Sequence, residues 1–158
     1  MFQVGDKIVH PMHGAGIIES IVTKKVNGVV RDYYTLKLPE RAMLVMIPVE
    51  NCTEIGVRPI VACEFAAEVL NSFSTLQVEL TQNWNRRYRE NMDRLRSGDL
   101  LEVARVVKGL MLRDSKHGLS TGERKMLHSA KQILISEIVL STGNGYEEVE
   151  RRINVTPL

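Results

Sequence analysis

The sequence has few cysteines, few aromatic residues and no long apolar run. Its two cysteines, Cys52 and Cys63, do not form a CxxC pair, so the chain offers no disulfide framework. No apolar stretch approaches the ~20 residues that a membrane-spanning helix needs. The first ten residues lack the basic start and apolar core of a signal peptide. We therefore expect a cytoplasmic protein without a membrane segment.

No arrangement of residues indicates catalysis. His10 and His13 form an HxxH, but no Asp, Glu or Cys lies close in sequence to complete a metal site. Gly14-Ala15-Gly16 lacks the third glycine of a dinucleotide loop, because that position is Glu19. These glycines are better explained by a sharp bend of a strand. The cysteines are expected to be buried small hydrophobes. We expect no enzyme, no cofactor, no metal and no small-molecule substrate.

What is present is a globular composition with an uneven charge. The chain has 158 residues, 44% of them apolar and 25% charged, which suits one ordinary domain or two small ones. The net charge of +2 hides a basic block, because residues 83–131 hold twelve Lys and Arg against six Asp and Glu. Such a block indicates either a nucleic-acid footprint or a solvated helix surface. Charge alone leaves both alternatives open.

The pattern of turns predicts an α+β protein of two domains. Residues 1–58 contain short strands and the hairpin turn Asn27-Gly28, which predicts a small barrel or curled sheet. Residues 59–158 are predicted to be all helical, with Pro59 in the first turn of the first helix. Asp99 and the capping box from Ser120 to Glu123 mark two further helix starts.

The segment Met43–Ile47 is apolar on both faces of a strand. Met43, Val45 and Ile47 share one face, and Leu44 and Met46 share the other. A sheet of fewer than 60 residues buries one face readily, so the second face is expected to be exposed and to bind a partner. The alternative is that the helix after Pro59 covers it.

The helix from Trp84 to Arg96 combines an apolar stripe with arginines. The stripe consists of Trp84, Tyr88, Met92 and Leu95. One interpretation is a core-facing stripe that includes the single tryptophan of the chain. The other is that Trp84, in the first turn and beside Arg86, Arg87 and Arg89, projects towards DNA. Arginines would then hold phosphates while the ring wedges at a base step.

These residues resemble a known family of transcription regulators. The stretch VGDKIVHPMHGAGII, residues 4–18, resembles the opening of the CarD family and of the related polymerase-binding domain of transcription-repair coupling factor. NWNRRYRENMDRLRSGD, residues 83–99, resembles the first DNA-facing helix of CarD proteins, and GLSTGERKMLHSAKQIL, residues 118–134, their later helix. The coupling factor is a large ATP-driven translocase, whereas this chain is short and has no P-loop motif.

The resemblance implies a Tudor-like or SH3-like domain that binds the β subunit of RNA polymerase, followed by a helical DNA-binding domain. The regulator would hold promoter DNA at the upstream edge of the bubble and stabilise the open complex in the bacterial cytoplasm, nucleoid-associated through polymerase. The implied DNA-binding residues are Trp84, Arg86, Arg87, Arg89, Arg124 and Lys125. The implied polymerase-binding residues are Lys24, Met43, Leu44, Val45, Met46 and Ile47. Some relatives carry an Arg at the position of Met46, so an apolar contact is expected there instead.

Two alternatives stay open at this point. One is a free-standing DNA-binding protein that acts without polymerase, which predicts promoter affinity in its absence. The other is a histidine-dependent metal enzyme, which predicts that His10 or His13 is needed for an activity.

Overall fold

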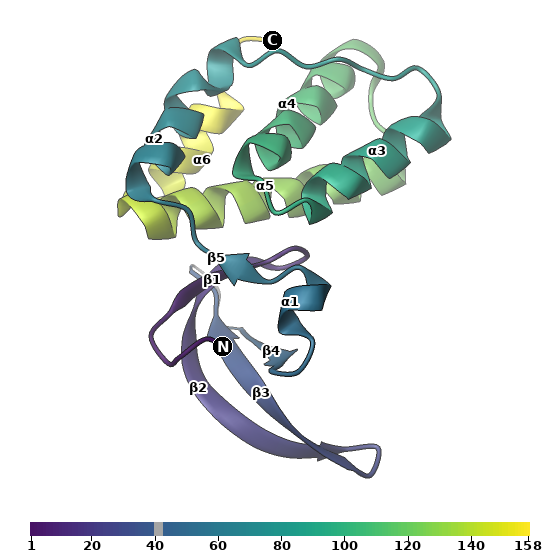
Figure 1. Ribbon diagram of the computed structural model, residues 1–158. Helices are drawn as coiled ribbons and strands as arrows, with labels where there is room; N and C mark the ends of the chain where they lie inside the picture. The colour runs from purple at the N-terminus through teal and green to yellow at the C-terminus, as the bar shows by residue number, and fades with distance from the viewer. Residues whose placement is uncertain (40–42) are drawn as a thin grey trace.

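The computed structural model describes residues 1–39 and 43–158, in a sheet domain and a helical domain (Figure 1). This two-domain α+β architecture confirms the predicted fold class. The sheet is antiparallel, with the strand order β4-β3-β2-β1-β5. Its elements are β1 (Lys7–His10), β2 (Gly14–Val26), β3 (Val29–Lys37), β4 (Leu44–Pro48), the short helix α1 (Cys52–Ile55) and β5 (Arg58–Pro59).

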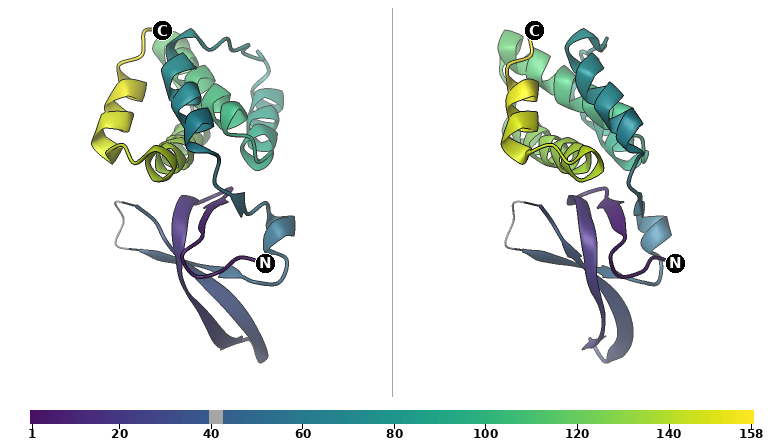
Figure 2. Two further views of the ribbon diagram at one scale, coloured as in Figure 1. Left: turned by 60° about the vertical axis from the view of Figure 1, so that its left-hand side comes forward. Right: turned by 90° about the vertical axis from the view of Figure 1, so that its left-hand side faces the viewer.

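The hairpin of β2 and β3 is the longest part of the sheet and extends away from the helices (Figure 1). Asn27 and Gly28 form its turn with φ angles of 51° and 81°, in the left-handed region that these residues tolerate. A register shift between Ile18 and Ser20 marks a β-bulge, which increases the local twist. The predicted turn is confirmed, and the sheet is curled (Figure 2).

The sheet has its own small core around the buried ring of Tyr34. The other buried members of this cluster are Ile8, Ile18, Leu36, Leu38, Ile47, Cys52 and Val57. The hydroxyl of Tyr34 accepts a hydrogen bond from the amide of Phe2 at 3.1 Å. A Cβ on Gly16 would lie 2.6 Å from the carbonyl oxygen of Lys37, so the close approach of β2 to β3 requires a glycine.

Pro59 belongs to the sheet and not to the first helix. Pro59 pairs with Ile8 in β5, at the edge of the sheet, and the first helix of the second domain begins only at Cys63. The prediction that Pro59 starts a helix is therefore wrong, because an edge strand accommodates a residue without an N–H group equally well. Cys52 is buried as expected, whereas Cys63 is exposed in the first turn of its helix.

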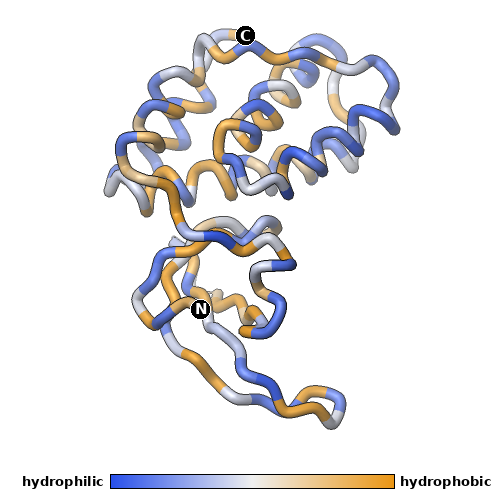
Figure 3. The backbone as a smooth tube through the Cα atoms, viewed as in Figure 1, coloured by the Kyte–Doolittle hydropathy of each residue, from blue (hydrophilic) through white to orange (hydrophobic). Residues whose placement is uncertain are grey.

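The helical domain packs its helices around one larger core. Its elements are α2 (Cys63–Ser72), the 3-10 turn η1 (Phe73–Thr75), α3 (Trp84–Arg96), α4 (Leu100–His117), α5 (Thr121–Thr142) and α6 (Tyr146–Asn154). Side chains of Asn83, Asp99 and Ser120 cap α3, α4 and α5, which confirms the predicted starts of the last two. Along the tube in Figure 3, α3 is largely hydrophilic. None of the helices in residues 1–39 and 43–158 is long and apolar enough to cross a membrane.

Helix α5 joins the two domains through a packed junction. Val9 and Ala15 of the sheet belong to the same core as the helices. The Ser136 hydroxyl accepts a hydrogen bond from the amide of Ala15 at 2.9 Å. The Glu137 carboxylate, fully buried, accepts two hydrogen bonds from the Arg58 guanidinium at 2.7 and 2.6 Å and a third from the Val61 amide. The domains are therefore held in a fixed arrangement by buried polar contacts as well as by apolar packing.

Candidate functional site

Strand β4 lies at an edge of the sheet and presents an apolar outer face. It pairs with β3 alone within the described part of the chain, from Leu44 opposite Lys37 to Pro48 opposite Tyr33. Leu44 and Met46 are 51% and 38% exposed, whereas Ile47 is buried. The predicted alternation is therefore confirmed for these residues. Helix α2 packs on α4 and α5, and the exposure of Leu44 and Met46 shows that it does not cover this face of β4.

The other predicted polymerase contacts are placed around this strand. Met43 is exposed just before β4 and next to residues 40–42, which lie outside the described residues. Val45 is half-buried. Lys24 is exposed but does not adjoin β4, because it pairs with Arg31, two residues beyond the point where β4 ends. The structure therefore brings the apolar candidates together and places the lysine further out on the hairpin.

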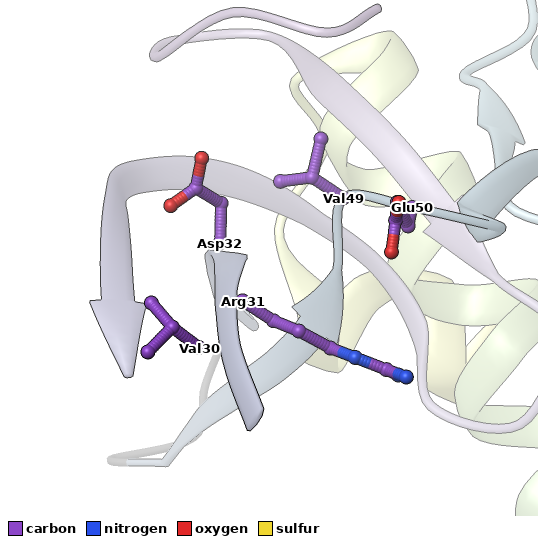
Figure 4. Close-up of a pocket in the computed structure, with 5 residues that line it drawn as sticks. All are labelled: Val30, Arg31, Asp32, Val49 and Glu50. Atoms are coloured by element: carbon purple, nitrogen blue, oxygen red, sulfur yellow. The ribbon is translucent and has the colours of Figure 1, made fainter. Parts of the chain in front are cut away.

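A hollow that the sequence did not predict lies beside the start of β3 and the residues that follow β4. Its volume is about 390 Å³, and it is lined by Val30, Arg31, Asp32, Val49 and Glu50. Figure 4 shows Arg31 and Asp32 leaving β3 in opposite directions. Asp32 accepts a hydrogen bond from the Thr23 hydroxyl at 2.6 Å. The hollow joins two distant sequence segments, so no local pattern could have indicated it.

Trp84 begins α3 and is neither a core residue nor a free side chain. Its side chain is 42% exposed, and its ring stacks on Tyr88 with centroids 5.1 Å apart and planes at 19°. Its Nε1–H donates to the Ser120 hydroxyl at 3.1 Å. Further along the stripe, Met92 packs against the core and Leu95 is buried. The stripe is thus a core face whose N-terminal end emerges at Trp84.

The first turns of α3 and α5 lie side by side at this point. A Cβ on Gly122 would lie 3.8 Å from atoms of both Trp84 and Tyr88, at van der Waals contact, which places the start of α5 against these two rings. Two helix N-termini each contribute partial positive charge to the same surface. The predicted basic residues that are exposed here are Arg86, Arg89, Arg124 and Lys125. Arg86 also pairs with Glu90 at 3.1 Å, and Arg124 donates to the Leu119 carbonyl at 3.0 Å.

Arg87 does not join this surface, and its burial argues against the predicted contact with DNA. Its side chain is only 3% exposed. It donates to both carboxylate oxygens of Glu123, at 2.8 and 3.1 Å, and to the carbonyls of Thr81 and Gln82 at 2.9 and 3.1 Å. The face of α3 that carries Arg87 is turned towards α5, where a buried carboxylate receives it.

Glu123 was predicted only as a member of the capping box. Ser120 does cap α5, accepting a hydrogen bond from the Glu123 amide at 3.2 Å, but the Glu123 carboxylate is turned to Arg87. The hydrogen bonds from Arg87 hold the pKa of the Glu123 carboxyl below its ordinary value, with burial opposing them. The partners are 36 positions apart, so sequence spacing gave no signal of the pair.

The two histidines do meet, in the turn between β1 and β2. Their ring centroids are 4.7 Å apart. The His10 Nδ1 atom accepts a hydrogen bond from the Met12 amide at 3.0 Å, and burial, with His13 nearby, lowers the pKa of His10 to about 4. Within residues 1–39 and 43–158, no group of three or more His, Cys, Asp or Glu side chains is placed to hold a metal ion. A neutral His10 that stabilises its own turn explains this geometry.

Comparisons with known proteins match both domains. The family model described as CarD-like/TRCF RID domain matches residues 2–61, and the model described as CarD, C-terminal domain, matches residues 68–154. A curated relative from Bacillus subtilis (strain 168), named "Putative transcription factor YdeB", is 36% identical over 143 residues, which cover 90% of this chain and 94% of the relative. The chain therefore belongs to the CarD family of transcription factors and carries an N-terminal domain of the RID type.

Proposed function

We propose that this protein binds the β subunit of RNA polymerase through β4 and promoter DNA through the first turns of α3 and α5. It stabilises the open complex by holding the upstream edge of the melted bubble. The observation that carries this proposal is the half-exposed Trp84 ring at the start of α3, beside the start of α5. The N-terminal parts of these two helices also carry four exposed cations, Arg86, Arg89, Arg124 and Lys125. The family membership of both domains supports the same assignment.

The polymerase contact rests on the chemistry of an edge strand. Within residues 1–39 and 43–158, no strand pairs with the outer edge of β4, so its backbone groups can pair with a strand of another protein. The exposed side chains of Leu44 and Met46 add apolar area beside those groups. Backbone pairing supplies affinity, and the side chains supply selectivity for a partner with an apolar surface.

The DNA contact combines charge with a flat ring. Arg86, Arg89, Arg124 and Lys125 neutralise phosphates, which releases counterions and makes affinity depend on salt. The exposed side of Trp84 then contacts the last paired base step at the edge of the bubble. Binding that favours the melted state by about 1.4 kcal/mol shifts the melting equilibrium tenfold.

The two contacts act together. Docking on polymerase raises the effective concentration of the helical domain at the promoter, so modest DNA affinity is sufficient. A free-standing DNA-binding protein would have no use for the open face of β4. A histidine-dependent enzyme is disfavoured because His10 is committed to the Met12 amide and no third ligand lies beside it in the described residues. We therefore propose a non-enzymatic regulator that works without a cofactor in the bacterial cytoplasm, at the nucleoid.

The polymerase contact predicts that charge on the outer face of β4 abolishes capture. The double change Leu44→Glu and Met46→Glu should weaken capture of polymerase at least tenfold, because burying an unpaired carboxylate in an apolar interface is costly. Both side chains are exposed, so the free energy of unfolding should change by no more than about 0.5 kcal/mol per site. Pull-down of purified polymerase and denaturant unfolding measure the two effects.

Phe65→Glu is the matched control for that experiment, because Phe65 is also an exposed apolar residue but lies on α2. It should leave capture unchanged. Unfolding of the double variant, or equal loss of capture in the control, would show that β4 is not the polymerase-binding strand.

The DNA contact predicts a salt dependence that is set by a few side chains. Arg89→Ala and Lys125→Ala should each flatten the slope of log K against log salt by about 0.9 if each neutralises one phosphate. Promoter affinity in the presence of polymerase, measured from about 50 to 200 mM salt, gives this slope. Arg151→Ala, an exposed arginine on α6, is the control and should leave the slope unchanged. Equal slopes in all four proteins would remove the phosphate contacts from this surface.

A further inference from the structure

The buried pair of Arg87 and Glu123 is linked to Trp84 along two routes. On one, Arg87 donates to the carbonyls of Thr81 and Gln82, in the segment that leads into α3. On the other, Ser120 stands between Glu123 and the ring. Its hydroxyl donates to the Glu123 carboxylate at 3.5 Å, and it accepts hydrogen bonds from the Glu123 amide at 3.2 Å and from the Trp84 Nε1–H at 3.1 Å. The pair therefore fixes both the backbone that carries Trp84 and the partner that its indole requires.

Nearly all polar side-chain atoms of Arg87 and Glu123 have a hydrogen-bond partner. Arg87 donates from Nε, Nη1 and Nη2, and both carboxylate oxygens of Glu123 accept. Arg113 Nε lies 4.0 Å from Glu123 Oε1 and is a buried donor that has no hydrogen-bond partner among the residues the structure describes. A second guanidinium beside the carboxylate adds to the low pKa of Glu123, so the pair stays charged at neutral pH. Its geometry is consequently rigid rather than adaptable.

We propose that Arg87 and Glu123 are positioning residues, which hold the Trp84 ring in the orientation that meets the bubble edge without themselves touching DNA. Ser120 completes the arrangement by fixing the indole N–H. This inference rests on the proposed function for its DNA consequence, but its structural part concerns the ring alone. Arg87 is the one buried arginine of α3, and this inference gives it a specific role.

The rival explanation is that the pair only stabilises the fold, and the chain contains a comparison for it. Arg58 and Glu137 form a second two-bonded pair, at 2.7 and 2.6 Å, with a fully buried carboxylate. Glu137 and Glu123 both belong to α5 but lie 14 positions apart, which is about 21 Å along a helix. Glu123→Gln and Glu137→Gln thus remove the same charge from a buried ion pair. The first change lies near the Trp84 ring and the second lies far from it.

The single tryptophan of the chain makes its own fluorescence the readout. In Glu123→Gln, quenching of Trp84 by acrylamide should rise about twofold and its emission should shift to longer wavelength, whereas Glu137→Gln should change neither. Ser120→Gly is a second variant, which removes the hydroxyl. Because glycine is tolerated at an N-cap position, it should give the same change with little loss of melting temperature. Glu123→Asp, which keeps the charge, should restore part of the wild-type signal.

The open-complex lifetime, measured per folded molecule, tests the functional part. It should fall about threefold to tenfold in Glu123→Gln and Ser120→Gly, as for loss of one hydrogen bond that orients the ring. The slope of affinity against salt should stay as in wild type, because no phosphate contact is removed. Wild-type quenching in both variants, or altered quenching with a wild-type lifetime, would overturn the inference. A wild-type lifetime in Trp84→Ala would instead overturn the proposed function, whatever the quenching data show.

Discussion

Replacing Gly14 by Ala is expected to destabilise the protein by roughly 2–6 kcal/mol, because it combines backbone strain with a clash. Gly14 has a φ of 94°, which L side chains rarely adopt. A Cβ at this position would lie 2.6 Å from Ser136 Oγ and 3.3 Å from the carbonyl oxygen of Gln132. Ser136 cannot turn away freely, since it accepts the Ala15 amide and donates to the Ile133 carbonyl. Denaturant unfolding measures the loss.

Gly5→Ala is the matched control for this change. Gly5 has nearly the same φ, 93°, but a Cβ on it would have no heavy atom within 4 Å. It should therefore lose only the part due to backbone strain, about 1–3 kcal/mol. An equal loss of unfolding free energy in the two variants would mean that the domain junction can accommodate an added methyl group, so that it is not tightly packed.

The junction matters because α5 connects the two proposed contacts. Its first turn carries Arg124 and Lys125, and its later turns carry Ser136 and Glu137, which are bonded to the sheet domain. A helix of 22 residues spans about 33 Å, so under this proposal α5 would set the distance between the two contacts. Loosening the junction should weaken the coupling between docking and DNA contact even where each surface is intact.

Local patterns predicted the parts of the fold that depend on neighbouring residues. The Asn27-Gly28 turn and the caps at Asp99 and Ser120 follow from backbone chemistry within a few positions, and the structure has all three. The alternation along β4 likewise follows from the two faces of a strand. The strand at Pro59 was missed because proline is compatible with both a helix start and an edge strand.

The features that depend on distant partners were less predictable. Arg87 looks like its exposed neighbours in the sequence, and only the position of Glu123, brought close by the packing of α3 on α5, distinguishes it. The partial exposure of Trp84 has the same origin, because Ser120 and Gly122 arrive from another helix. Helical periodicity identified the stripe but could not say where along it the protein surface begins.

Trp84→Ala is expected to shorten the lifetime of the open complex about tenfold or more while leaving polymerase capture intact. A base stacked on an aromatic ring is worth about 1–3 kcal/mol, and 1.4 kcal/mol corresponds to a factor of ten. The cost in stability should be small, about 1–2 kcal/mol, because truncating a fully buried aromatic costs 3–5 kcal/mol and this ring is 42% exposed. Capture should survive because β4 belongs to the other domain.

Phe65→Ala provides the comparison, since Phe65 is exposed to a similar extent, 37%, on α2. It should lower the melting temperature by a similar amount and leave the open complex as in wild type. A shortened lifetime in this variant would point to a general effect of instability and not to a contact of the Trp84 ring.

The most direct measurement is therefore the open-complex lifetime of Trp84→Ala, followed with a fluorescent base in the melted region and set against the melting temperature of the same protein. We predict a lifetime about tenfold shorter per folded molecule, with a modest fall in melting temperature. A large fall in melting temperature with an unchanged lifetime would make Trp84 a packing residue, and the surface formed by α3 and α5 would then lose its proposed contact with the bubble.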